Sequence, residues 1–584
     1  MATPRMRGLA RRARSDVSMP LIAVLALLLV GFCVAVPLAY LIGHAASADA
    51  VRAALDEPFL GSTFRDTIVF AVLSCVVSLV IGGGLAFLVT RTDLPFRKTV
   101  TALLMVPIVI PGVLYAMSWV LIASPRIGLL DFYLHITWFS SYSLTGMSVV
   151  QGMALAPLAF LTLLAPLRSL DVSLEEAALL HGATNWRTYR RVTIPLIRPA
   201  TLTTGVLLLA LNIEAFEIPA ILGVPGNTYT FTTLIYRVMH ESPPDFGEAS
   251  VLSLIVMVLL VAALLGQAYF TKHQRSYRTI TGKAYRRSLV PLRGLRLPVF
   301  LVVVVYLLIA TVLPIVIVVY AGARTFYAVP TGEALSQLDW TAYRTVLESE
   351  DVRNAAWNTI QIALVVATVA IVVAAVVAWA RYKISNPVLR WLIDVACNVP
   401  LAIPGVVTGV ALLGFYVNVS IPIYGTIAVL MIGYFTGFIP LAMRYSETAM
   451  FQIGNELDEA AQVGGSTRLR AFARVFLPLA SGGLISGWIF LVIVAFRSLS
   501  TAVLLYSPGS KVLPVLVYEQ WTNGVIPKAS AIGVIQLGII AIFGLVVFVL
   551  LRVARRLTRP ATPPATRTGP GAPVEELPME KVLV

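Results

Sequence analysis

Charged residues are scarce in this chain of 584 residues, since Asp, Glu, Lys and Arg make up 12% of it against roughly 25% in an average soluble protein. Hydrophobic residues make up 58% and fall in runs of about 20 or more, the length that a helix needs to cross a membrane. This composition excludes an ordinary soluble domain. The net charge of +15 does not indicate nucleic-acid binding, because the basic residues gather at the ends of the apolar runs, as cytoplasmic loops do.

Cysteine, histidine and nucleotide-binding motifs are also scarce or missing. Cys33, Cys75 and Cys397 lie in or beside apolar runs at unrelated spacings, which predicts small buried side chains and neither a disulfide framework nor a metal site. The five histidines form no His-x-x-x-His pattern, and we expect no cofactor. No Gly-x-x-x-x-Gly-Lys-Ser/Thr loop occurs, so the chain has no phosphate-binding loop of its own. The sequence also has no recognisable set of catalytic residues, so we expect that the chain is not an enzyme.

Twelve apolar segments can be counted, and each predicts a transmembrane helix. The first follows five arginines between residues 5 and 14 and is too long for a signal peptide, so we expect it to be retained with its basic end in the cytoplasm. The linker 271–297 carries eight Lys and Arg and no acid, whereas 324–356 carries three Arg and five acids. Six crossings therefore return the chain to the cytoplasm at the linker. The segments are 20–42, 64–90, 100–123, 144–167, 199–223, 248–270, 298–322, 357–381, 393–417, 423–443, 482–506 and 529–552.

The second half of the chain repeats the first. Asp66-Thr67-Ile68 returns as Asn358-Thr359-Ile360, and Ile110-Pro111-Gly112 returns as Ile403-Pro404-Gly405. The predicted fold class is all-α, a polytopic membrane protein of about 12 transmembrane helices in two parallel six-helix repeats, whose symmetry axis lies along the membrane normal. The predicted organisation is a basic cytoplasmic N-terminus (1–19), a first repeat (20–270), a basic cytoplasmic linker (271–297), a second repeat (298–552) and a disordered cytoplasmic tail (553–584).

Two loops, about 171–195 and 454–478, carry the same motif 283 residues apart. In both, the step from Glu to Gly is 6 residues and the step from Gly to Pro is 13. Ser173 and Glu176 fit a capping box, the glycines suit helix ends, and Thr184 suits the cap of a second helix. Each loop thus predicts helix, turn, helix, with small and apolar side chains that fit a groove on a partner. The alternative is an interfacial helix without a partner. The motif residues are Glu176, Ala177, Ala178, Gly182 and Pro195, and Glu459, Ala460, Ala461, Gly465 and Pro478.

These paired loops resemble the EAA loops of inner-membrane permeases of binding-protein-dependent ABC importers. The resemblance implies two permease units fused end to end in a bacterial inner (plasma) membrane, with both termini cytoplasmic. It also implies two separate ATP-binding subunits docked on the loops at the cytoplasmic face, and a soluble or lipid-anchored solute-binding protein at the outer face. One departure is Ile194 before the first proline, where the family usually has Leu.

The solute is indicated only by softer resemblances. The stretches 217–223, 231–236 and 504–509 look like the ferric-iron branch of these permeases, which implies ferric iron. Importers of the same class for thiamine, phosphonate or polyamine remain alternatives. An ion-coupled secondary transporter of 12 spans is the rival from another class, but it would have no use for paired EAA loops.

Three charged residues lie within apolar segments: Glu214 and Glu217 in the fifth, and Arg497 in the eleventh. An ionised side chain near the bilayer centre costs about 2.5–3.5 kcal/mol, so such residues usually face the bundle interior or water and often pair. Aligning the halves on the EAA prolines places Arg497 opposite Glu214, whereas aligning them on their Ala-Phe pairs places it opposite Glu217. The resemblance implies that all three line the translocation path, and we expect an ion pair that acts as a gate. A purely structural ion pair, or solvation near the outer surface, is the alternative.

Overall fold

The structure is a computed structural model that describes residues 18–557 except 126, 171, 275–289, 385, 420–422, 424, 452, 454–465 and 467. Helices form its regular elements, apart from one isolated β-bridge between Thr92 and Val290. Ten described helices are long and apolar enough to cross a membrane, or twelve if each of two sharply bent helix pairs counts as one span. The predicted all-α class is confirmed. The chain divides into two compact units, 1–537 and 538–584, and the account below concerns the first.

The helices of the first half follow the predicted segments closely, with short helices added between the spans. They are α2 (Ser18–Ala45), α3 (Ala48–Asp56), α4 (Leu60–Arg91), α5 (Arg97–Val109), α6 (Gly112–Ala123), α7 (Leu129–Leu134), α8 (Leu144–Arg168), α9 (Val172–Leu180), α10 (Asn185–Thr188), the π-turn η1 (Tyr189–Thr193), α11 (Ile194–Ile213), the π-turn η2 (Pro219–Gly223), α12 (Phe231–His240) and α13 (Phe246–Gln274).

The second half repeats this order. Its helices are α14 (Arg296–Leu307), the π-turn η6 (Leu308–Val312), α15 (Leu313–Gly322), α16 (Gly332–Ser336), α17 (Thr341–Glu348), α18 (Glu350–Lys383), α19 (Pro387–Asn398), α20 (Gly405–Asn418), α21 (Ile427–Phe451), α23 (Arg468–Ala471), the π-turn η8 (Phe472–Phe476), α24 (Leu477–Arg497), α25 (Ala502–Leu505), α26 (Leu513–Thr522) and α27 (Ile526–Leu557).

The third and ninth predicted spans, 100–123 and 393–417, are each a bent pair of helices that is broken at the Ile-Pro-Gly sequence. α5 and α6 meet at 101°, and the helices before and after Pro404 meet at 104°. Proline lacks the N–H that a continuing helix needs, and the residue before it favours extended backbone. Ile110 and Ile403 are indeed extended.

The fifth and eleventh spans also end earlier than predicted. α11 stops at Ile213 and α24 stops at Arg497, about ten residues before the predicted ends at 223 and 506. The carbonyls freed at these ends find side-chain partners, which a helix end inside a membrane protein requires. Thr232 Oγ1 donates to the carbonyl of Ala215 at 2.7 Å, and Gln536 Nε2 donates to the carbonyl of Phe496 at 2.7 Å.

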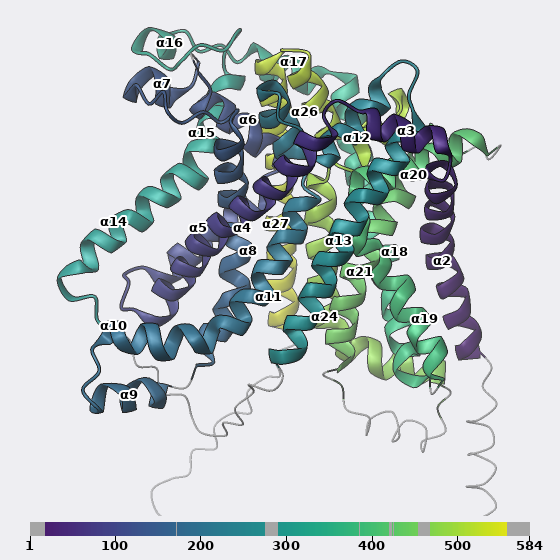
Figure 1. Ribbon diagram of the computed structural model, residues 1–584, viewed down its shortest axis with the longest axis horizontal. Coiled ribbons are helices and arrows are strands. Elements are labelled where there is room, and N and C mark those ends of the chain that lie inside the picture. Colours follow the sequence, from purple (N-terminus) through teal and green to yellow (C-terminus); the bar gives the residue numbers. More distant parts are fainter. Residues whose placement is uncertain are drawn as a thin grey trace, which may run out of the picture. The chain divides into compact units, whose positions relative to one another are not determined.

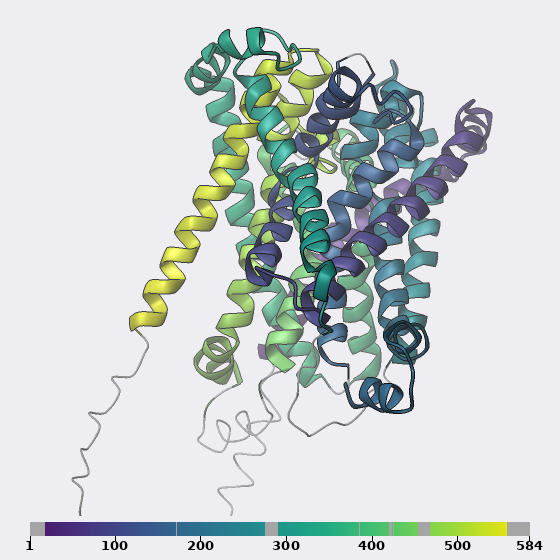
Figure 2. The same ribbon diagram turned by 90° about the vertical axis from the view of Figure 1, so that its left-hand side faces the viewer.

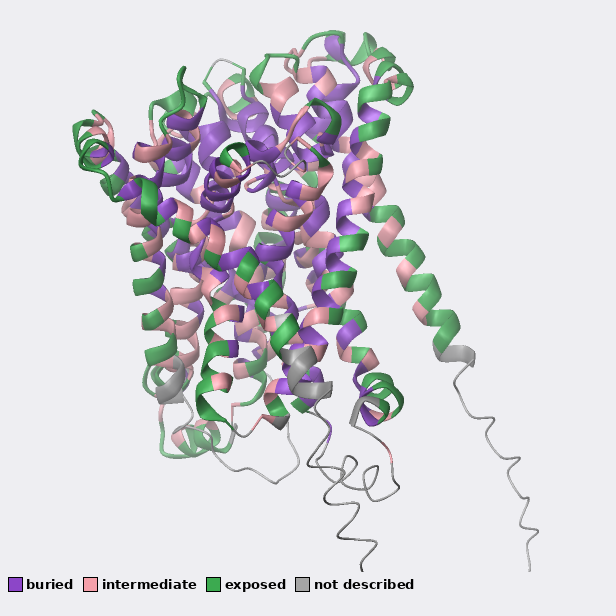
Figure 3. Ribbon diagram, turned by 90° about the vertical axis from the view of Figure 1, so that its right-hand side faces the viewer, coloured by how far each residue is buried: buried purple, intermediate pink, exposed green. Residues whose placement is uncertain are grey.

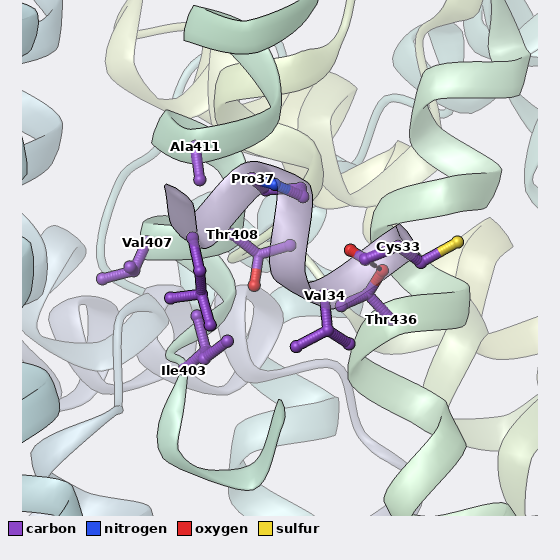
Figure 4. A pocket seen from close by; sticks show the side chains of 9 residues that line it. Cys33, Val34, Pro37, Ile403, Val407, Thr408, Ala411 and Thr436 are labelled. Atoms are coloured by element: carbon purple, nitrogen blue, oxygen red, sulfur yellow. Dashed lines mark hydrogen bonds between the residues drawn. The ribbon is translucent and has the colours of Figure 1, made fainter. Parts of the chain in front are cut away.

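The two halves interlock through their first helices. α2 packs on α18 and α20 of the second half, whereas α15 packs on α6 of the first. Asn418 Nδ2 of α20 donates to the hydroxyl of Tyr40 at 2.8 Å. Pro37 removes the helical donor for the carbonyl of Cys33, and Thr436 Oγ1 of α21 replaces it at 3.3 Å. Figure 4 shows Cys33, Pro37 and Thr436 beside a small apolar pocket between α2, α20 and α21.

The helices of the first unit run between two ends (Figures 1 and 2). α9 and α10 lie at one end, named the α9 end here, and α2 begins there. α3, α12, α16 and α17 lie at the opposite end, named the α12 end. Buried residues gather where the helices face one another, and outward faces are exposed (Figure 3). All three cysteines are buried free thiols, as predicted.

Candidate functional site

The first predicted docking loop folds as helix, turn, helix. α9 ends in a Schellman motif, in which the N–H of Ala183 donates to the carbonyl of Ala178 and the N–H of Gly182 to that of Leu179, both at 3.0 Å. Gly182 has a φ of +78°, the left-handed conformation expected of it. Thr184 Oγ1 accepts the N–H of Arg187 at 3.3 Å and so begins α10 as predicted.

α9 presents an exposed surface at the α9 end. Glu176 and Ala177 are exposed and Ala178 is half-buried. Leu180 is 88% exposed, and Leu174 and Leu179 are exposed to nearly half. α9 begins at Val172, so the predicted capping box was wrong, because Ser173 lies inside the first turn and not at the N-cap. Apolar side chains grouped on an exposed helix are typical of an interaction surface.

The opposite side of α9 is held by a carboxylate that the sequence analysis missed. Glu175 Oε2 forms an ion pair with Arg91 Nη2 at the end of α4, and Glu175 Oε1 accepts a hydrogen bond from Thr193 Oγ1 at 2.7 Å. A signal for these residues exists in the repeat. An acid precedes both EAA motifs, as Glu175 and Asp458, and a basic residue ends the second helix of both repeats, as Arg91 of α4 and Lys383 of α18.

The second EAA loop is described only in its later part, because Glu459, Ala460, Ala461 and Gly465 lie outside the described residues. Both loops lead through a short helix and a π-turn into a long helix, and Pro195 and Pro478 stand in the first turn of α11 and α24. In both, the residue before the proline donates its N–H to the carbonyl five residues earlier. The two loops therefore share their local backbone geometry as well as their spacing.

The three predicted path charges lie at the helix breaks and not within continuous spans. Glu214 caps the end of α11, Glu217 lies in the break that follows, and Arg497 is the last residue of α24. Arg497 Nη1 donates to the carbonyl of Ile108, whose helical partner the bend after α5 removes. Glu217 Oε1 accepts a hydrogen bond from Ser500 Oγ at 3.2 Å.

Arg497 therefore forms no ion pair with either glutamate in this conformation of the described chain. Glu217 still lies close enough to interact electrostatically with both Arg497 and Glu214. The predicted ion pair is not formed because each charged group has a nearer partner. The guanidinium of Arg497 donates to a backbone carbonyl, and the carboxylate of Glu217 accepts from a hydroxyl.

Glu217 and Ser500 are equivalent residues of the two repeats, and they touch. Each lies 22 residues after its EAA proline. A Cβ atom at Gly112 would lie 3.2 Å from Glu217 Cβ, and one at Gly405 would lie 2.9 Å from Ser500 Cβ, so the surroundings match as well. Equivalent residues of a two-fold repeat meet only beside its axis. The structure thus favours the alignment on the EAA prolines, in which Glu214 corresponds to Arg497.

A second pair of equivalent residues meets at the α12 end. Tyr236 of α12 and Tyr518 of α26 have ring centroids 5.9 Å apart, and both rings pack on the buried Phe216. Matching hydrogen bonds fix the starts of the two helices, since Thr67 Oγ1 accepts the N–H of Phe231 and Thr359 Oγ1 accepts that of Leu513. Burial raises the pKa of Tyr236, and that of Tyr518 to about 12, so both phenols are neutral near pH 7.

These features define a membrane transport subunit made of two fused, interlocked repeats. The family described as the inner membrane component of binding-protein-dependent transport systems matches residues 78–276 and 370–560. The chain belongs to this family. It is therefore a multi-pass inner-membrane permease of an ABC importer and is not itself catalytic, and the family works with an ATPase and a solute-binding protein. This membership rules out the ion-coupled secondary transporter.

Several curated relatives are similar over most of the chain. An Fe(3+)-transport system permease protein of Haemophilus influenzae is 23% identical over 92% of this chain and 99% of its own length. A ferric transport system permease protein of Actinobacillus pleuropneumoniae is 24% identical over 70% of this chain and 59% of its own length. A putrescine transport system permease protein of Escherichia coli is 25% identical over 37% of this chain and 78% of its own length.

Proposed function

We propose that this permease imports ferric iron. The observation that carries the proposal is its likeness to the Haemophilus influenzae permease over nearly the full length of both chains. Relatives named for putrescine and molybdenum match only about one third of this chain. The putrescine relative supports a polyamine as the second candidate solute. Thiamine and phosphonate stay as expectations from the sequence.

Two ATP-binding subunits dock on the permease, one on each EAA loop, and the first of them docks on α9. The exposed Leu180 and Leu174 beside the small Ala177 provide an apolar surface for a groove on the first ATPase. The second ATPase takes the loop that contains Glu459, Ala460, Ala461 and Gly465, in line with the spacing that both loops share.

The α9 end faces the cytoplasm, and both chain termini are cytoplasmic. This orientation follows from the basic residues before α2 and in the linker 271–297 and from the acidic loop 324–356. The solute-binding protein then meets the α12 end. The repeat boundaries 20–270 and 298–552 belong to the same proposal.

The translocation path follows the axis between the repeats. Its outer closure is the pair Tyr236 and Tyr518, and its deeper closure is the pair Glu217 and Ser500. Both pairs join the two halves, so separating the halves opens both. Glu214 and Arg497 lie beside this axis and contribute the charged side chains that line the path.

Transport by the complete complex tests the solute. The permease is reconstituted in liposomes with its own ATPase and its own solute-binding protein, and uptake of radioactive ferric iron is measured with ATP inside. ATP-dependent uptake that unlabelled ferric iron abolishes, and that putrescine, thiamine and phosphonate leave unchanged, supports ferric iron. Uptake of radioactive putrescine in place of iron would transfer the assignment to the polyamine.

A further inference from the structure

We infer that Arg91, Glu175 and Thr193 form a mechanical latch, which ties the docking helix α9 to α4 and α11 and transmits ATPase movement into the membrane. The inference rests on the proposed docking role of α9. None of the three residues belongs to the exposed face that would meet the ATPase, so their role is to position that face and not to bind the partner.

The latch holds α9 from two sides. Arg91 ends α4 and is separated from Glu175 by 84 residues, whereas Thr193 ends the π-turn that leads into α11. Each carboxylate oxygen of Glu175 has one of these partners. The side chains of Arg91 and Glu175 are only 6% and 14% exposed, and Thr193 is fully buried. The short helix α9 is thus fixed to two long helices through one carboxylate.

Burial makes this connection stiff. Pulling α9 away from α4 would leave a guanidinium and a carboxylate unpaired in a place with little water, which is far less favourable than breaking an exposed pair. Arg91 Nε is buried and has no hydrogen-bond partner, and the ion pair that the structure gives this guanidinium is the contact of Nη2 with Glu175. α9 and α4 therefore move together when an ATPase displaces α9.

α4 carries this movement to the opposite end of the molecule. Its 32 residues run from the latch to the α12 end. There Thr67 Oγ1 accepts the N–H of Phe231 at 3.1 Å and so holds the start of α12, which bears Tyr236. One rigid helix thus joins the docking loop to the tyrosine pair on the axis.

Arg381 of the second half lies two residues before Lys383, the last residue of α18 and the one that matches Arg91 when Thr67 and Thr359 are aligned. Arg381 of α18 pairs with Asp394 of α19, with Nη2 and Oδ2 3.0 Å apart, and with Glu447 of α21 at 3.5 Å. Its side chain is 34% exposed. These described partners lie on membrane helices, and the latch is argued for the first half, whose docking loop is described.

The test measures how much solute is transported for each ATP hydrolysed by the reconstituted complex. Glu175→Gln removes the charge and keeps the shape, and we expect it to lower this ratio about tenfold, within the usual range of coupling between sites. Thr193→Val removes one hydroxyl and should lower the ratio roughly threefold, whereas Thr193→Ser should restore it. Asp394→Asn is the matched control, because it removes the carboxylate of another ion pair, that with Arg381, whose side chains are 34% and 37% exposed and lie on α18 and α19, outside the described docking loop.

Binding of the ATPase separates this inference from the proposed docking role. Leu180→Asp should lower the number of bound ATPases from two per permease to one, whereas Glu175→Gln should keep both. If Leu180→Asp still binds two ATPases with normal affinity, the docking role of α9 fails. If Leu180→Asp loses one ATPase but the latch variants transport as much per ATP as the control, the latch alone is overturned. If the Glu175→Gln variant does not reach the membrane, the solute transported per ATP by Thr193→Val decides instead whether the latch exists.

Discussion

Replacing Gly182 with valine tests whether the turn after α9 sets the docking geometry. A Cβ atom at Gly182 would meet no atom within 4 Å, so the substitution adds backbone strain without a clash. Because φ is +78°, the strain is about 1–2 kcal/mol. That energy corresponds to a factor of about 5–30 in an equilibrium. We expect ATPase affinity to weaken by up to this factor, with a matching loss of solute-stimulated ATP hydrolysis.

The chain provides a matched control for this variant in Gly524. It also has a φ of +78°, also has no atom within 4 Å of its would-be Cβ, and also ends a helix in a Schellman motif. Gly524→Val should therefore lower thermal stability as much as Gly182→Val and leave ATPase affinity unchanged. Equal ATPase affinities for the two variants, measured on purified permease in nanodiscs, would refute the reasoning.

The remaining predictions concern the partners and the path. Native mass measurement of the detergent complex should give one permease to two ATPases, and a ratio of one to one would contradict docking on both loops. A double-mutant cycle of Glu217→Gln and Ser500→Ala, read from resting ATP hydrolysis, should give a coupling of about 0.5–1.5 kcal/mol, whereas additive effects would place the two residues apart. Tyr236→Ala should raise resting ATP hydrolysis and Tyr518→Ala should match it, because the two are equivalent; a large difference between them would argue against a shared closure. Arg497→Glu should impair transport or assembly, since it sets a carboxylate near Glu217 and opposite a carbonyl, and normal uptake would mean that position 497 faces water.

Features governed by local sequence were predictable. Long apolar runs need only length and hydrophobicity to become helices, so α4, α8 and α13 fall within a few residues of their predicted ranges. The left-handed turn at Gly182 was likewise readable, because a glycine after a short helix is the usual solution to its free carbonyls.

Features governed by distant partners were not predictable. The carbonyl of Ala215, just after α11, accepts a hydrogen bond from Thr232, and the carbonyl of Phe496 at the end of α24 accepts one from Gln536, 40 residues further along the chain. The Ile-Pro-Gly sequence was recognised as a repeat and its proline is a local reason for the bend, but the partner of the freed Ile108 carbonyl, Arg497, lies 389 residues away. The pairing of Arg91 with Glu175 joins residues 84 apart, and one carboxylate cannot be told from its neighbour without the fold.

Fusion of two repeats into one chain allows the residues at the axis to differ. A symmetric dimer would place identical side chains against each other there. Two tyrosines tolerate this, because their rings pack edge to face. Two glutamates would repel each other in a site with little water. In this chain the residue equivalent to Glu217 is Ser500, whose hydroxyl donates to the carboxylate, and the residue equivalent to Glu214 is Arg497. The fused chain can therefore keep charge beside its axis and still close around it.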